Sequence, residues 1–337
     1  GIGIMPTYSM VGVIAPIAII FFRIIQGFSI GGEIPGAITY ISESFTEYKG
    51  FACGLIFCAI LFGIVMGSLA HALIVTLFLE PQIQAYAWRI PFIIGGILGL
   101  ISCVLRKELH ESTQFLQMEH LIEKFPLLVV VKEQSILTIA GALITALCAV
   151  VVTALFLFNP VYFKEVLNLS ANAYAWERTL SITLGALLTV LVGYMTDIIA
   201  APKLVLIAAL TGIVFAYPIF LIYCYYPNMY HLAFLASAIL LGLSAGSIPR
   251  LLSELFPTQI RYSAIAVSYN LGFAIFGGLT PFISLSLIYS TGVKTIPAVY
   301  IMCISLLVLM SLYVLHKSKL NGVTNNNSLA NEPLQIV

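Results

Sequence analysis

Long apolar runs constrain this chain more than any other feature of its sequence. A helix that crosses a bilayer needs about 20 predominantly apolar residues. The sequence predicts nine such spans, at 15–41, 51–79, 86–106, 135–160, 176–197, 203–225, 230–251, 263–288 and 294–315. We therefore predict an all-α membrane protein with about nine transmembrane helices.

The composition excludes other broad classes of protein. Of the 337 residues, 61% are hydrophobic and 9% are charged, whereas a soluble domain carries about 25% charged residues. The net charge of +1, without a basic run, excludes a nucleic-acid partner. The six cysteines lie scattered in apolar stretches without a C-x-x-C pair, so we expect apolar fillers rather than disulfides or metal ligands. The motifs of hydrolases, metalloproteases and P-loop enzymes are absent, so the sequence predicts no enzyme, no cofactor and no metal.

Lysine and arginine near the span ends predict the orientation. One side collects ten of them, at 49, 106, 107, 124, 132, 203, 250, 261, 317 and 319, and the other collects four, at 89, 164, 178 and 294. The richer side is expected to be cytoplasmic, together with the charged segment 107–134 and the C-terminus. The polar, Asn-rich tail 316–337 is expected to be disordered. The chain opens Gly1-Ile2-Gly3-Ile4, which reads as the end of a further span, so we expect a piece of a longer frame.

A short internal repeat suggests duplicated halves, which are common in transporters. Ser42-Glu43-Ser44-Phe45 returns as Ser253-Glu254-Leu255-Phe256, and a cation follows each copy, Lys49 and Arg261 respectively. Two similar span-to-loop transitions are the alternative explanation of this short match.

The span 15–41 carries polar residues that a lipid-facing helix would not. Arg23, Gln26, Ser29, Glu33 and Tyr40 lie on one broad helical stripe. An ionised side chain at bilayer depth costs at least about 2.5–3.5 kcal/mol, so the stripe must face a polar cavity or another helix. In one interpretation Arg23 braces helix packing and Glu33 reaches the membrane interface. In the other, Arg23 binds a carboxylate or responds to a proton, and Glu33 binds a cation or accepts the proton.

Three further positions carry polar side chains in or beside spans. Tyr269 and Asn270 lie in the span 263–288, where Asn270 either links helices or lines a cavity. Asp197, the only aspartate, ends a span, where it caps the next helix or forms a gate ion pair. His71 is a lone histidine inside a span, which more often is a packed polar residue than a proton relay.

Several of these segments together resemble the major facilitator superfamily, in its metabolite:proton symporter branch. Arg23-Ile-Ile-Gln26-Gly27-Phe-Ser-Ile-Gly31-Gly32-Glu33 is similar to the fourth helix of that family. Three other stretches agree in the expected order, beginning at Trp88, at Leu105 and at Glu254: Trp88-Arg-Ile-Pro-Phe92, Leu105-Arg-Lys-Glu-Leu-His-Glu-Ser112, and Glu254-Leu-Phe-Pro-Thr-Gln-Ile-Arg261-Tyr262. Ile198-Ile-Ala-Ala201 departs from the family at a gating motif, where basic residues are usual.

The resemblance implies a truncated form of the fold, lacking about the first three helices. Residues 1–106 would be the remainder of the N-terminal bundle, 107–134 the central cytoplasmic loop, 135–315 a six-helix bundle and 316–337 the tail. It implies a proton-coupled symporter of a small zwitterion or organic acid, acting as a monomer in the inner membrane. Its partners would be the substrate, the proton and the lipid bilayer.

The resemblance also assigns roles to residues. The substrate and proton path would use Arg23, Gln26, Glu33, Tyr40, Tyr269 and Asn270, and gate or packing pairs would use Glu43, Asp197, Arg250, Glu254 and Arg261. Three alternatives stay open: a fragment without transport activity, a facilitator without proton coupling, and an intramembrane enzyme. A single aspartate and scattered histidines argue against the enzyme.

Overall fold

The structure, a computed structural model, describes residues 1–45, 47–105, 126–170 and 174–325. Within these residues all regular secondary structure is helical, and nine helices are long and apolar enough to cross a membrane. They are Ile14–Ser44, Lys49–Leu77, Ala87–Leu105, Ser135–Leu157, Ala175–Ile198, Ala201–Tyr225, Pro227–Leu255, Arg261–Thr291 and Ile296–Lys317. The prediction of nine spans in an all-α membrane protein is confirmed.

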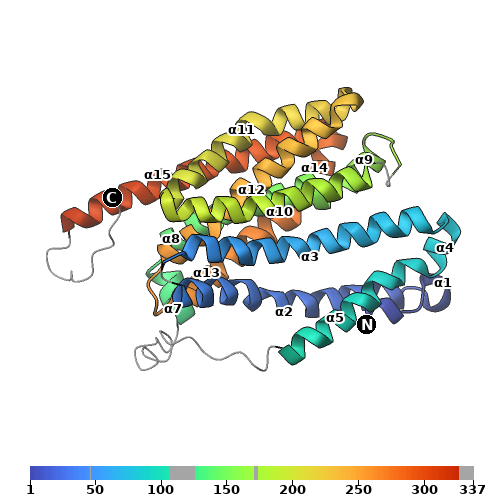
Figure 1. Cartoon of the computed structure of the whole chain (residues 1–337), viewed down its shortest axis with the longest axis horizontal. Helices are drawn as coiled ribbons and strands as arrows, with labels where there is room; N and C mark the ends of the chain where they lie inside the picture. The colour runs from blue at the N-terminus through green and yellow to red at the C-terminus, as the bar shows by residue number, and fades with distance from the viewer. Residues whose placement is uncertain (46, 106–125, 171–173, 326–337) are drawn as a thin grey trace.

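The first third of the chain supplies three of these spans. Its elements are η1 (Ile2–Ile4), α1 (Tyr8–Val11), α2 (Ile14–Ser44), α3 (Lys49–Leu77), α4 (Glu80–Ala85), η2 (Ala87–Arg89) and α5 (Ile90–Leu105). This part is loosely packed at its outer helices. Only five of the 31 residues of α2 are buried, and every residue of α5 is at least partly exposed in the described structure. Figure 1 shows α5 alongside the N-terminal end of the chain, away from the C-terminal helices.

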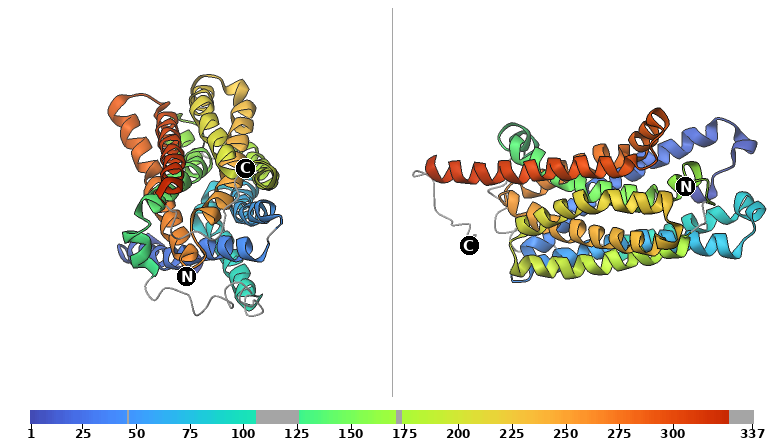
Figure 2. Two further views of the ribbon diagram at one scale, coloured as in Figure 1. Left: turned by 90° about the vertical axis from the view of Figure 1, so that its left-hand side faces the viewer. Right: turned by 90° about the horizontal axis from the view of Figure 1, so that it is seen from above.

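The remaining elements supply six spans. They are α7 (Pro126–Lys132), α8 (Ser135–Val152), η5 (Thr153–Leu157), α9 (Asn159–Glu165), α10 (Ala175–Ile198), α11 (Ala201–Tyr225), η6 (Pro227–Met229), α12 (Tyr230–Leu255), α13 (Arg261–Leu271), η7 (Gly272–Gly277), α14 (Gly278–Thr291) and α15 (Ile296–Asn325). In α8, thirteen of the 18 residues are buried, because it packs against α12, α13, η7 and α15. The end-on view in Figure 2 shows these helices gathered into one bundle.

One long contact joins the two parts. α3 runs beside α10 along most of its length and also packs on α12, and α2 contacts α13 (Figure 1). The α3–α10 pair therefore makes the most extensive contact between the two parts.

Two spans contain π-helical segments, η5 and η7, which are often found at functional positions. In the second, the Phe276 carbonyl accepts hydrogen bonds from the Thr280 hydroxyl at 2.7 Å and the Tyr300 hydroxyl at 3.0 Å. These hydroxyls satisfy a carbonyl at a point where helical pairing is irregular, just before Pro281.

The structure differs from the sequence expectations at two segments. α15 continues to Asn325, into the tail 316–337 that was expected to be disordered. The polar composition of the tail does not end the helix, because Leu and Lys at 315–320 are good helix formers. Within the expected loop 107–134, residues 126–132 form α7, while 106–125 and 326–337 lie outside the described residues.

Candidate functional site

The polar stripe of α2 lies on a part of that helix where every residue from 16 to 34 is at least partly exposed. Four of the five buried residues of α2 fall between Pro35 and Glu43, so the segment carrying Arg23 and Glu33 is exposed. Arg23 Nη1 donates to Gln26 Oε1 at 3.0 Å, one turn along the same helix. The Tyr40 side chain is also exposed, at 41%. The structure thus keeps both charges accessible and orients the Arg23 guanidinium through Gln26.

A hollow of about 390 Å³ lies between α2 and the end of α13, on a side of α2 that carries none of the stripe residues. It is lined by Ile24, Gly27, Phe28, Gly31 and Asn270. Asn270 Nδ2 donates to the Gly31 carbonyl at 2.7 Å and to the Ala266 carbonyl at 2.8 Å. Asn270 therefore links α13 to α2 and lines the hollow at the same time, combining the two roles that the sequence left as alternatives.

Tyr269, the neighbour of Asn270, points into the packed interior instead. Its ring stacks on Phe273, with centroids 4.5 Å apart and planes at 23°. It meets Phe57 of α3 edge-on at 6.3 Å, and only 5% of the residue is exposed. The structure therefore does not place Tyr269 on the exposed surface of α2 with Arg23.

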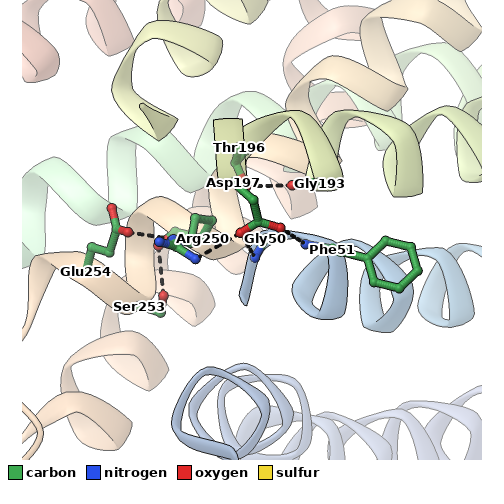
Figure 3. Close-up of polar contacts among 8 residues, drawn as sticks. All are labelled: Gly50, Phe51, Gly193, Thr196, Asp197, Arg250, Ser253 and Glu254. Carbon is green, nitrogen blue, oxygen red and sulfur yellow. Dashed lines mark hydrogen bonds and ion pairs between the residues drawn. The ribbon is translucent and has the colours of Figure 1, made fainter. Parts of the chain in front are cut away.

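Asp197 joins the two parts of the chain at one end of the α3–α10 interface (Figure 3). It lies in the last turn of α10, and its carboxylate accepts backbone hydrogen bonds from Gly50 at 2.7 Å and Phe51 at 2.8 Å. These N–H groups open α3, where a helix has unpaired donors and a partial positive charge. Asp197 is therefore the N-terminal cap of α3, supplied by a helix 146–147 residues away in the chain.

Arg250 of α12 completes this cluster. Its Nη1 lies 3.2 Å from Asp197 Oδ1, and its Nε pairs with Glu254 one turn further along α12 (Figure 3). The Asp197 side chain is 7% exposed, whereas that of Glu254 is 35% exposed. Asp197 thus links α10 to α3 and α12. Glu254 pairs with the Arg250 guanidinium on its more exposed side.

A second ion pair joins α2 to α13 at the same end. Arg261 Nη1 donates to Glu43 Oε1 at 3.0 Å, and Arg261 Nε donates to the Phe256 carbonyl at 3.2 Å. The Glu43 side chain is 5% exposed. The two glutamates of the internal repeat therefore pair differently, Glu43 with a distant helix and Glu254 within its own helix.

Glycines allow the close approach of α3 and α10 beside Asp197. A Cβ on Gly193 would lie 2.7 Å from the Gly50 carbonyl oxygen and 2.8 Å from the Gly54 Cα. A Cβ on Gly50 would meet Gly193, Asp197 and Thr196. Close contact of small residues is the usual way that membrane helices pack tightly.

The structure therefore divides the predicted site residues into groups. Arg23, Gln26, Glu33 and Tyr40 are exposed on α2, and Asn270 borders the hollow beside Gly27 and Gly31. The five gate or packing residues form the two clusters just described. Sequence reasoning missed Gly50 and Phe51, because their backbone N–H groups carry no side-chain signal. It also gave Arg178 no site role, although this buried arginine contacts His71.

Comparisons with known proteins agree with this architecture. A family model described as "Major Facilitator Superfamily" matches residues 1–176. A Staphylococcus haemolyticus (strain JCSC1435) protein, assigned by name to proline/betaine transport, is 30% identical over 341 residues, covering 94% of this chain and 69% of the relative. A Salmonella typhi protein named citrate-proton symporter is 29% identical over 309 residues, covering 90% of this chain and 71% of the relative.

A solved structure shares the fold. The proton:xylose symporter XylE, bound to 6-bromo-6-deoxy-D-glucose, superposes with a TM-score of 0.64 at 17% identity. The match covers 83% of this chain and 66% of the XylE chain. This chain thus spans roughly two thirds of the length of the proteins it matches.

Proposed function

Because this chain belongs to the major facilitator superfamily, a family of multi-pass membrane transporters rather than enzymes, we propose that it acts in proton-coupled symport of a small zwitterion or organic acid. The substrate class is that of a proline/betaine-like osmolyte or a carboxylate. One observation carries the proposal: α2 carries a cation and an anion, Arg23 and Glu33, and both side chains are exposed in the segment that precedes Pro35. Ionised groups are costly within a bilayer and mark substrate or proton pathways there.

The proposed roles of Arg23 and Glu33 follow from their opposite charges. The Arg23 guanidinium, held by Gln26, binds the carboxylate of the substrate as a planar donor. Glu33 takes up the coupled proton. Ten residues separate the two, about 15 Å along the helix axis, so a small substrate at Arg23 leaves Glu33 accessible to water. The named activities of the two relatives fit this scheme, because proline, betaine and citrate all carry a carboxylate.

Alternating access would occur across the α3–α10 interface. The Asp197 cluster lies at one end of it, and the Glu43–Arg261 pair joins α2 to α13 at the same end. We assign this end to the cytoplasm of an inner-membrane protein with a cytoplasmic C-terminus, because the lysine- and arginine-rich side predicted from the sequence includes Arg250 and Arg261. We also propose that the chain works as a monomer, with residues 1–106 and 135–315 moving as two bodies about the segment 107–134.

Uptake by the purified chain tests the proposal. The chain is reconstituted in liposomes with an imposed pH gradient, acid outside, and offered labelled betaine, proline and citrate in turn. We expect accumulation of at least one of them that a protonophore abolishes. Glu33→Gln should remove the proton-driven accumulation, and Glu165→Gln, a change of an exposed carboxylate on α9, should leave it unchanged.

The outcomes separate the alternatives. Uptake that a protonophore leaves unchanged indicates a facilitator without coupling. No uptake of any of the three by correctly inserted protein overturns the proposal for this chain and supports the interpretation as an inactive fragment. Unchanged accumulation in Glu33→Gln removes Glu33 from the mechanism.

A further inference from the structure

At the end of the α3–α10 interface opposite Asp197 lies a buried cation that the transport proposal does not use. Arg178 sits in the first turn of α10 and is 3% exposed. Nineteen residues separate it from Asp197, which is about 28 Å of helix. Within the described residues its Nη1 atom is buried without a hydrogen-bond partner, and it forms no ion pair with a carboxylate.

Among the described residues, the side-chain hydrogen bond partner of Arg178 is a histidine, and the bond defines the state of that partner. Arg178 Nη2 lies 3.4 Å from His71 Nδ1 on α3. A guanidinium has only donors, so His71 Nδ1 must accept. The histidine in this arrangement is neutral, with its proton on Nε2. A second proton on His71 would place N–H against N–H and leave two cations facing each other.

The neighbouring hydroxyls cannot neutralise this charge. Thr179 Oγ1 donates to the Ala175 carbonyl at 2.8 Å, so the 2.6 Å contact between Ser68 and Thr179 uses the Ser68 proton. The titratable group facing Arg178 from α11 is Tyr223, a buried phenol. Among the described residues, Arg178 is the charged group that acts on His71. Within the described residues, Arg178 therefore carries a positive charge that no carboxylate compensates, and its Nη1 hydrogens have no acceptor.

We propose that Arg178 and His71 form an oxyanion-binding site at this end of the α3–α10 interface, with a small carboxylate as its ligand. The carboxylate would accept from Nη1 and Nη2 of Arg178, the paired geometry that guanidinium groups favour. His71 is only half-buried, and so is Ser68 one turn before it, which gives an approach from the α3 side. Protonated His71 adds a third donor, so binding strengthens as the pH falls. The site is separate from Arg23 and does not depend on the proposed transport.

Acetate titration tests the site, because acetate carries the carboxylate without a cationic group. Trp176 lies two residues before Arg178 and is 45% exposed, and the chain has one other tryptophan, Trp88. A Trp88→Phe background therefore makes Trp176 fluorescence a local reporter. The protein is held in phosphatidylcholine nanodiscs at constant ionic strength, balanced with sodium fluoride, at pH 7.5 and pH 5.5.

We expect a saturable fluorescence change with acetate that is tighter at pH 5.5. Arg178→Met should weaken it at least about tenfold, because a charge-assisted hydrogen bond is lost. Lys164→Met, which removes an exposed cation from neighbouring α9, should leave it unchanged. His71→Gln retains an acceptor for Arg178 and should bind acetate equally at both pH values, so it tests the site even if Arg178→Met folds poorly.

A parallel arm with phosphatidylglycerol distinguishes a lipid phosphate from a soluble carboxylate. An Arg178-dependent response to acetate in phosphatidylcholine identifies the carboxylate, and one to phosphatidylglycerol alone identifies a lipid phosphate in the same oxyanion site. No response in either arm, or an equal response in Arg178→Met, overturns the proposal. Because binding is measured without transport, a negative result here leaves the symport proposal standing.

Discussion

Asp197 caps Gly50 across the interface between the two parts of the molecule: its Oδ1 accepts the Gly50 N–H at 2.7 Å, and Oδ2 accepts that of Phe51 at 2.8 Å. The contact joins the C-terminal end of α10 to the N-terminal end of α3 (Figure 3). The carboxylate meets the positive end of the α3 dipole and the Arg250 guanidinium together. The cap is therefore a charge-assisted contact between α3 and α10, of a kind stronger than a hydrogen bond between neutral groups.

Asp197→Asn should therefore loosen this end of the interface. The amide oxygen can replace one acceptor, but the amide nitrogen faces an N–H group, and the charge opposite Arg250 is lost. Hydrogen bonds to charged groups contribute about 1.5–3 kcal/mol each. We expect a clear fall in thermal stability and at least about tenfold faster maleimide labelling of Cys53, a residue that is 0% exposed in α3. Labelling is measured with the other five cysteines changed to alanine.

Glu254→Gln is the matched control for this prediction. Glu254 pairs with the same Arg250, but within one helix and 35% exposed. Such pairs contribute only about 0.3–0.5 kcal/mol. Equal labelling rates in Asp197→Asn and Glu254→Gln would show that Asp197 does not hold α3 in place.

The glycines beside Asp197 give a second prediction. Gly193→Ala should be strongly destabilising, because its Cβ would lie 2.7–2.8 Å from backbone atoms of α3, which cannot move aside like a side-chain end. Gly63→Ala, on the same α3 helix, has no atom within 4 Å of its Cβ. It should be neutral or stabilise by up to about 1 kcal/mol through helix propensity. Thermal unfolding in detergent measures both, and a Gly193→Ala protein as stable as Gly63→Ala would contradict the close packing.

These contacts show where sequence reasoning succeeds and where it stops. Each membrane span is recognisable alone, because length and apolar composition are local properties, and all nine were predicted to within a few residues. The pairing of spans is not local. The sequence predicts that Asp197 caps the next helix or forms a gate ion pair, whereas its carboxylate caps α3. Its partners there are backbone N–H groups some 147 residues away, which look the same at every position.

The candidate site shows the same division. Helical spacing predicts the stripe from Arg23 to Tyr40, and its side chains are exposed in the structure. Tyr269 and Asn270 are adjacent in sequence, yet one packs between rings and the other reaches α2. A helix turns by about 100° per residue, so the direction of each side chain depends on which neighbours the fold supplies. Arg178 shows a further limit, because no sequence pattern predicts that a buried arginine lacks a carboxylate partner among the described residues.

The Glu43–Arg261 pair gives a third prediction, on coupling. Breaking a buried ion pair by removing one of its members costs about 3–5 kcal/mol. Arg261→Met and Glu43→Gln should each destabilise the protein, and the double variant should be less destabilised than the sum of the two. A double-mutant cycle on unfolding free energies measures the coupling. Additive effects would mean that the 3.0 Å contact does not couple the two residues energetically.

The link from Asn270 to α2 gives the last prediction. Asn270→Ala removes the hydrogen bond to the Gly31 carbonyl and leaves α2 attached mainly through the segment from Pro35 to Glu43. Interhelical hydrogen bonds of this kind contribute about 0.6 kcal/mol, and at most about 1.7. Amide hydrogen exchange in the α2 peptide 24–34 should therefore become about three- to twentyfold faster, while α8 peptides keep their rates. Asn228→Ala, which truncates an exposed asparagine in η6, controls for the loss of an amide side chain. Unchanged exchange in 24–34 would mean that other contacts hold α2 against α13, and that Asn270 lines the hollow without stabilising α2.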